Sequence, residues 1–261
     1  MNQNTVVIGE GKTKIVKTNP NDPKTVLLYF KDDITAGDGV KHDVFEGKAA
    51  LDWAASRDCF ELLSRRGLNT HYVDSPEERI MCVRKLDSKL ELEIVTRRVA
   101  TGSILKWGDC SEGERFDPVI TQFHYKDDPL HDPMLDDRYV EFMVREKDAG
   151  EYAVMRQMNT RAFLILEAAF AQFGVQLVDL KLEYGIIDDE LCVIDEISGG
   201  SFRLWPYRSE TPDLELSNVL SELAPEQRLD KDTYRMGAAP DEVLSKFRAI
   251  STLTSRFKEL A

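Results

Sequence analysis

This chain of 261 residues has few cysteines, no long apolar run and no excess of basic residues. The four cysteines contain no Cys-x-x-Cys spacing and no pairing pattern, which favours reduced, packed thiols over a disulfide framework. No apolar run approaches the ~20 residues of a membrane span, and the N-terminus lacks the layout of a signal peptide. We therefore expect a cytoplasmic protein that is neither exported nor inserted in a membrane.

The charge balance argues against a nucleic-acid partner. Lys and Arg number 34 and Asp and Glu number 47, so the formal net charge is −13, whereas binding to a phosphate backbone needs a basic surface. Hydrophobic residues make up 42% of the chain, with 15 glycines and 10 prolines, a composition that can bury a core. The length predicts one large domain or two small, closely joined ones.

Hydrophobic periodicity predicts a mixture of helices and antiparallel strands. Apolar residues at spacings of three and four predict helices over residues 46–66, 152–173 and 241–260. Runs of β-branched and aromatic residues predict strands over residues 5–18, 25–30, 70–73, 80–86, 90–100, 119–125, 175–185 and 191–197. Residues 75–78 are expected to form a turn. This order predicts an α/β (α+β) fold in which two lobes pack around a cleft.

The first candidate site is the segment Gly-Glu-Gly-Lys-Thr-Lys at residues 9–14. It is not a P-loop, because Val6 stands where that motif requires a glycine and the surrounding pattern is that of a strand. In an extended strand Lys12 and Lys14 would share one face, where two ammonium groups can bind one polyanion. A solvated lysine pair on an edge strand is the alternative.

The second candidate is a group of charged residues on two predicted strands. Asp179, Lys181 and Glu183 alternate along one strand and so face the same side, and the paired strand brings Asp195 near them. Glu183 and Asp195 suit Mg²⁺ held between protein and nucleotide phosphates. The alternative is a solvated sheet face, but apolar residues flank these positions and favour a buried strand pair.

The third candidate is a set of arginines near a glycine and a hydroxyl. Arg97 precedes the Gly102-Ser103 pair, and Arg203 lies in the segment Ser-Phe-Arg-Leu-Trp at residues 201–205. Guanidinium groups bind phosphate or carboxylate in bidentate fashion. In an acidic protein such arginines either bind an anionic substrate or are neutralised by nearby acids, and their spacing does not separate these alternatives.

Together with other segments, these motifs resemble the phosphoribosylaminoimidazole-succinocarboxamide synthase (SAICAR synthetase) family. The matching segments, in order, are residues 9–14, 33–39, 97–106, 126–133, 177–185, 195–205 and 229–235. The resemblance implies two lobes with an ATP-grasp or kinase-like nucleotide site between antiparallel sheets and helices. Residues 1–88 would form the nucleotide-binding lobe, and residues 89–261 would carry the substrate and metal site.

The resemblance also implies a reaction. ATP, L-aspartate and 5-amino-1-(5-phosphoribosyl)imidazole-4-carboxylate (CAIR) would give ADP, phosphate and the succinocarboxamide SAICAR through an acyl phosphate. The implied cofactors are ATP and Mg²⁺, and the implied assembly is a homodimer or larger homo-oligomer.

Residue roles follow at the positions that match the family motifs. The resemblance assigns nucleotide binding to Gly11, Lys12, Lys14, Lys85, Glu183 and Asp195, the last two also holding Mg²⁺. It assigns substrate binding to Arg97, Ser103, Lys126 and Arg203. The residues implied at the reacting centre are Lys181, Asp38 and Asp132, with Asp38 as an acceptor for the proton of the attacking amine.

Two departures from the family pattern keep other functions open. Gly199-Gly200 stands where Pro-Asp is usual, and Trp107 stands where Arg is usual. A related ligase joining a different acid and amine is therefore one alternative. A small-molecule phosphotransferase and a catalytically silent nucleotide-binding regulator are alternatives from other classes.

Overall fold

A five-stranded antiparallel sheet forms the N-terminal part of the molecule in a computed structural model, which describes residues 5–36, 41–146, 152–206, 228–229, 234 and 237–260. The strands lie in the order β1-β2-β3-β7-β6. Their bounds are Val7–Glu10 (β1), Lys14–Thr18 (β2), Thr25–Phe30 (β3), Tyr72–Glu77 (β6) and Ile80–Arg84 (β7). A separate two-stranded ribbon joins Asp33–Ala36 (β4) to Lys41–Val44 (β5).

A second antiparallel sheet follows along the chain, with strand order β11-β10-β8-β9 and with β12 also paired to β10. Its strands are Ser88–Val99 (β8), Arg115–Tyr125 (β9), Val175–Ile187 (β10), Glu190–Ile194 (β11) and Phe202–Pro206 (β12). The hairpin between β10 and β11 turns at Asp188 and Asp189, whose φ angles are 52° and 62°. Two successive positive φ angles are what a two-residue turn of matching twist requires, and Asp tolerates them better than most residues.

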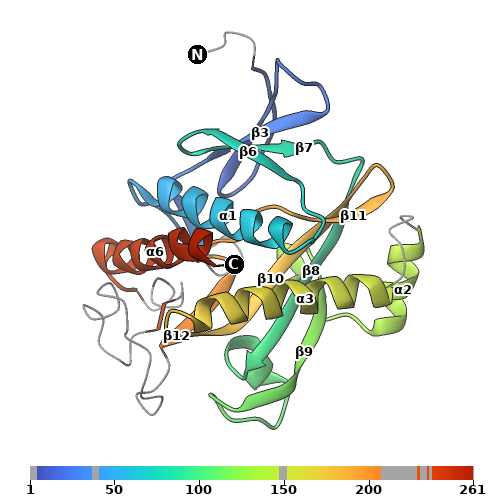
Figure 1. Cartoon of the computed structure of the whole chain (residues 1–261). Helices are drawn as coiled ribbons and strands as arrows, with labels where there is room; N and C mark the ends of the chain where they lie inside the picture. The colour runs from blue at the N-terminus through green and yellow to red at the C-terminus, as the bar shows by residue number, and fades with distance from the viewer. Residues whose placement is uncertain are drawn as a thin grey trace.

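Four α-helices accompany the sheets in the described residues: Lys48–Arg65 (α1), Asp137–Glu146 (α2), Tyr152–Ala171 (α3) and Pro240–Ser255 (α6). Short 3₁₀ segments cover Gly102–Lys106 (η1), Asp128–Leu130 (η2) and Arg256–Glu259 (η3). In Figure 1, α1 and α6 lie side by side between the N-terminal sheet and α3, which runs across the second sheet. No helix in the described part of the chain is long and apolar enough to cross a membrane.

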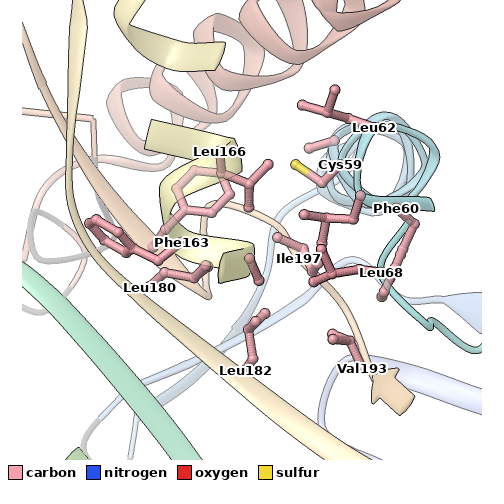
Figure 2. Close-up of a cluster of buried hydrophobic side chains, with 14 of the residues drawn as sticks. Cys59, Phe60, Leu62, Leu68, Phe163, Leu166, Leu180, Leu182, Val193 and Ile197 are labelled. Carbon is pink, nitrogen blue, oxygen red and sulfur yellow. The ribbon is translucent and has the colours of Figure 1, made fainter. Parts of the chain in front are cut away.

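The main core lies where α1, α3 and β10 meet (Figure 2). Leu62 of α1, Leu166 of α3 and Leu180 of β10 are each no more than 1% exposed. Full burial of such a side chain contributes roughly 1.5–3 kcal/mol, so these helices are held mainly by their apolar faces. The same cluster includes Leu28 of the N-terminal sheet, so one core joins both sheets.

The predicted fold class is confirmed, and α1 and α3 match the predicted helices closely. The predicted first strand is wrong in one respect, because residues 11–13 separate β1 from β2. The predicted turn at residues 75–78 is also wrong, because β6 continues through Pro76. Proline is tolerated there since β6 is an edge strand, whose outward N–H groups need no partner. The lobe boundary at residue 88 stays a prediction.

Candidate active site

A cavity of about 1480 Å³ is lined by residues of both sheets. Of the thirteen residues predicted for the site, twelve line it: Gly11, Lys12, Lys14, Lys85, Arg97, Ser103, Lys126, Asp132, Lys181, Glu183, Asp195 and Arg203. Asp38 lies outside the described residues. The structure therefore brings together segments from across the whole chain, while the role of each residue stays a prediction.

The register of the second sheet explains how these side chains come to share one surface. Asp179, Lys181 and Glu183 of β10 lie opposite Arg97, Val95 and Glu93 of β8. Because side chains alternate along a strand, these positions of β10 and β8 face the same side of the sheet. The outer strands add residues to this surface: Arg203 of β12 lies opposite Asp179, and His124 of β9 lies opposite Glu93.

One end of the cavity is a compact group of two arginines and one carboxylate. Asp179 Oδ2 accepts from Arg97 Nη1 at 2.8 Å and from Arg203 Nη1 at 2.5 Å, and Arg97 Nη2 donates to Ser103 Oγ at 3.1 Å. Burial lowers the pKa of Arg97, and the opposing effect of Asp179 is smaller. Guanidinium groups such as these can bind a phosphate or a carboxylate in bidentate fashion.

Gly102 closes this corner and has a structural reason to be glycine. Its φ is +66°, a backbone conformation that side chains disfavour. A Cβ at this position would lie 3.0 Å from Arg203 Nη2, so any side chain would press on the guanidinium. Arg98, which neighbours Arg97 in the sequence, instead pairs with Glu167 of α3 at 2.6 Å and lies outside the cavity. Only one of the two adjacent arginines therefore belongs to the site.

The opposite end contains two carboxylates surrounded by lysines. Glu183 is paired with Lys126 and lies 2.9 Å from Lys89, and Asp195 lies 3.0 Å from Lys14 Nζ. Asp195 directly follows β11, with a φ of 71°. Burial raises its pKa, but the attraction of Lys14 and then Lys126 outweighs burial and holds the pKa below the ordinary value. This carboxylate therefore stays ionised.

Lys14 is the buried cation of this end. It begins β2, is 8% exposed, and also lies 2.9 Å from Glu196. Burial lowers its pKa, yet Asp195 and Glu196 together raise it above the ordinary value. Lys12 differs, because it lies in the turn between β1 and β2 and forms an exposed pair with Asp128 at 2.6 Å. The predicted picture of two lysines along one strand face is wrong, although both line the cavity.

The middle of the cavity floor is formed by Lys181, whose Nζ lies 2.6 Å from Glu93. Burial lowers the pKa of Lys181, but Glu93 and Glu183 reverse the shift and raise it. Asp132 borders the same region, with Oδ1 accepting from the backbone N–H of Asp127 at 2.9 Å. Burial, and next the negative charge of Glu93, raise the pKa of Asp132.

Several lining residues were not assigned a role in the site from the sequence. These are Glu93, His124, Trp107, Lys48, Asp52 and Glu196. Glu93 carries the clearest missed signal, because it alternates with Val95 and Arg97 in a predicted strand and so had to share the face of Arg97. Asp52 and Lys48 form a buried pair within α1, and nothing in the helical pattern indicates that they reach a cavity.

Comparison with known proteins assigns the family. The SAICAR synthetase family model matches residues 7–247. The phosphoribosylaminoimidazole-succinocarboxamide synthase of Chloroflexus aurantiacus is 38% identical over 257 residues, covering 96% of each chain. A solved SAICAR synthetase (Type-2) in complex with ADP is 30% identical, with a TM-score of 0.80, and the match covers 95% of this chain and 97% of that one. A solved phosphoribosylaminoimidazole-succinocarboxamide synthase from Ehrlichia chaffeensis is 28% identical, with a TM-score of 0.81 and coverage of 96% and 98%. With a family model and full-length relatives in agreement, this chain belongs to the SAICAR synthetase family.

Proposed function

We propose that this protein joins L-aspartate to CAIR at the expense of ATP, producing SAICAR, ADP and phosphate for purine biosynthesis. The observation that carries the proposal is the division of one cavity into two chemically different ends. Paired carboxylates and lysines at one end suit a metal-bound triphosphate, and the arginine group at the other suits the phosphate of a ribotide. The relatives described above carry the name of this activity.

The chemistry requires the carboxylate of CAIR to be activated first. A carboxylate does not condense with an amine at neutral pH, because oxide is a poor leaving group. Transfer of the γ-phosphoryl group to a carboxylate oxygen of CAIR breaks the bond to ADP and forms an acyl phosphate. The protein needs to align the two groups and neutralise their charge, which is the task of fixed cations in a cavity.

The nucleotide would bind beside β1, β2 and β7. Lys14 supplies a cation whose charge is held by its buried environment, and Lys12 supplies a second from the turn that contains Gly11. Lys85 lies one residue beyond the end of β7 and lines the cavity. These residues would contact the phosphates and the edge of the nucleotide, and displacement of Asp128 from Lys12 would accompany binding.

The donor set at this end fits Mg²⁺. That ion usually takes one or two carboxylates together with waters and substrate phosphates. Glu183 of β10 lies opposite Ile194, and Asp195 follows Ile194 directly, so two carboxylates are available here. In the described ranges no group of three or more His, Cys, Asp and Glu residues is placed to hold a metal ion. Bound Mg²⁺ would neutralise charge on the transferring phosphoryl group. Lys126, already paired with Glu183, would then turn to the substrate.

The ribotide would place its phosphate against Arg97, Arg203 and Ser103. Its carboxylate would reach toward Lys181 and the metal end. Attack by the α-amine of L-aspartate on the acyl carbon expels phosphate, and the amine proton passes to a carboxylate. Asp132 suits that step because its raised pKa makes it a better base than an ordinary aspartate, and Asp38 is the second candidate.

A single assay separates this function from its alternatives. Purified protein is supplied with CAIR, ATP and Mg²⁺, and ADP release is measured with and without L-aspartate. The proposal expects release that depends on aspartate and a product that contains both substrates. Equal release without aspartate, together with a stable phosphorylated product, would identify a phosphotransferase. A related ligase would require another acid or amine, and a silent regulator would bind ATP without turnover.

We infer the cellular location and the oligomeric state from the family resemblance. The four cysteines are free thiols, and three of them are buried, which suits a reducing cytoplasm. We expect a homodimer or larger homo-oligomer, which sedimentation velocity would measure directly.

A further inference from the structure

The structure determines which ring nitrogen of His124, on β9, can accept a hydrogen bond. Its Nδ1 atom lies 3.0 Å from the backbone carbonyl oxygen of Asp132. A carbonyl oxygen only accepts, so Nδ1 must carry the proton. In a neutral imidazole the other nitrogen, Nε2, then carries a lone pair and can only accept. The carbonyl of Asp132 therefore selects the tautomer that His124 adopts.

The imidazole is also kept neutral by its surroundings. His124 is 6% exposed, and burial lowers its pKa, with a further lowering from the nearby guanidinium of Arg97. The hydrogen bond to Asp132, the charge of Glu93 and the charge of Asp132 act in the opposite direction and are outweighed. Of these residues, Arg97 and Glu93 belong to β8, and Asp132 belongs to the loop after β9. A buried neutral imidazole is a stable acceptor near neutral pH.

No group in the described part of the protein donates to this acceptor. Nε2 is buried and has no hydrogen-bond partner there. Buried polar atoms are normally satisfied, so an orphan atom in a cavity wall indicates a partner supplied by a ligand. The indole of Trp107 lies beside the imidazole, with 5.7 Å between ring centroids, and is 49% exposed. Because Nε2 is buried in this structure, a shift of this half-exposed indole would accompany the approach of a ligand to it.

The position of His124 in the sheet identifies the part of the substrate that it faces. His124 lies opposite Glu93, which lies opposite Glu183 at the metal end. The backbone of Arg97 lies four residues beyond Glu93 along β8, about 13 Å at the usual rise per residue, although its guanidinium reaches back to Gln122. In the proposed orientation, the ribotide phosphate lies at Arg97 and the carboxylate points toward Glu183. The carboxylate then lies level with His124, because Glu183, Glu93 and His124 are opposite one another on adjacent strands. The C5 amine of CAIR is attached to the ring carbon next to the one that bears this carboxylate.

We propose that Nε2 of His124 accepts a hydrogen bond from the C5 amine of the aminoimidazole ring and thereby selects ribotides that carry this amine. The inference rests on the proposed function, because the ribotide orientation comes from it. His124 acts in recognition and takes no proton from the substrate. A ligand lacking the amine leaves Nε2 buried without a partner, which is the situation that gives strong discrimination between otherwise similar substrates.

The test compares two substrates in three proteins. The substrates are CAIR and the same ribotide without its amine, 1-(5-phosphoribosyl)imidazole-4-carboxylate, and the proteins are wild type, His124→Phe and His124→Gln. We expect His124→Phe to lower kcat/KM for CAIR about 10- to 100-fold while changing that for the second ribotide less than about threefold. His124→Gln should recover part of the loss, because its amide oxygen can accept.

An equal loss for both ribotides in His124→Phe would overturn the proposal and indicate a structural role. An equal loss accompanied by disappearance of the acidic limb of the pH profile would also overturn it and indicate a general base. Aspartate-dependent turnover of CAIR by the wild type is the separate test of the proposed function, so the two failures are distinguishable.

A measurement on the wild type covers the case in which the variants do not fold. In protein carrying ¹⁵N-labelled histidine, CAIR should shift the unprotonated Nε2 resonance of His124 in the direction of hydrogen-bond acceptance. The ribotide without the amine should leave that resonance in place. The same shift with both ribotides would overturn the proposal.

Discussion

Asp179 Oδ2 accepts hydrogen bonds from Arg97 at 2.8 Å and, on the next strand, from Arg203 at 2.5 Å. One buried carboxylate thus holds both guanidinium groups of the anion-binding end in place. The carboxylate side chain is 5% exposed and that of Arg97 is 4% exposed, so water provides little replacement for either partner. The arrangement makes the substrate end of the cavity sensitive to a residue that need not touch the substrate.

Replacement Asp179→Asn should therefore lower the free energy of unfolding by roughly 3 kcal/mol, because it removes the countercharge of the buried Arg97 and one charged partner of Arg203. The KM for CAIR should rise as well. Urea denaturation and steady-state kinetics measure the two effects. Asp117→Asn is the control, since Asp117 is 84% exposed and lies 3.5 Å from Arg98. That variant should stay within about 0.5 kcal/mol of wild type. Equal losses in the two variants would contradict the prediction.

The metal end yields a prediction about turnover. Glu183→Gln and Asp195→Asn should each lower kcat by about 100-fold or more, because each removes a charge that would hold Mg²⁺ against the phosphates. Turnover in each variant should need more Mg²⁺ for half-maximal rate. Glu190→Gln is the matched control, because Glu190 lies on the same hairpin but outside the cavity. Full activity in both cavity variants would reassign the metal site.

The pairing of Lys14 with Asp195 predicts a pH dependence of stability. The pKa of Asp195 is lowered from the ordinary value of 3.8, so in the folded protein it stays ionised where the unfolded chain takes up a proton. Its contribution is fully present above about pH 5 and declines as the pH falls through 3.8 toward the lower folded value. The difference in unfolding free energy between wild type and Asp195→Asn should thus shrink from about pH 6 to about pH 3. Denaturation at a series of pH values measures it, and a difference that grows on acidification would rule out this pairing.

Gly102 and Gly113 form a matched pair for testing the anion-binding corner. Both have positive φ, of +66° and +89°, but a Cβ at Gly102 would meet Arg203 whereas one at Gly113 would meet nothing within 4 Å. Both alanine variants should lose about 1 kcal/mol or more of stability from backbone strain. Only Gly102→Ala should also raise the KM for CAIR, because it displaces the guanidinium. The same KM for CAIR in both variants would show that a Cβ at position 102 does not displace Arg203.

The elements that could be predicted from sequence are those whose pattern is local. The stripe of Met155, Ala162 and Leu166 repeats at helical spacing within one segment, so it identified α3 without knowledge of its neighbours. The charged alternation along β10 likewise placed Asp179, Lys181 and Glu183 on one face. In both cases the information lies within a few residues of the chain, which is the range over which periodicity operates.

Failures occurred where the partner of a residue lies far away in sequence. Pro76 was expected to lie in a turn, but it lies within β6, where proline is tolerated because β6 is at the edge of the sheet. Lys12 and Lys14 were expected to act side by side, but residues 11–13 form a turn, after which Lys14 reaches Asp195 and Lys12 reaches Asp128. Those outcomes depend on strand order and on loops that approach from other parts of the chain.

The sequence by itself determined the composition of the site: which cations, carboxylates and glycines are available, and which of them share a face along β8 and β10. Only the tertiary structure decided which of them meet. Register between β8, β9 and β10 sets Glu93 opposite both Glu183 and His124, and packing of the loop after β9 directs the Asp132 carbonyl at His124. A shift of one residue in the pairing register of a strand would turn its side chains to the opposite face of the sheet, because side chains alternate along a strand. The residues that supply the chemistry can therefore be predicted from local sequence patterns, but which of them meet in the site depends on strand pairing between distant parts of the chain.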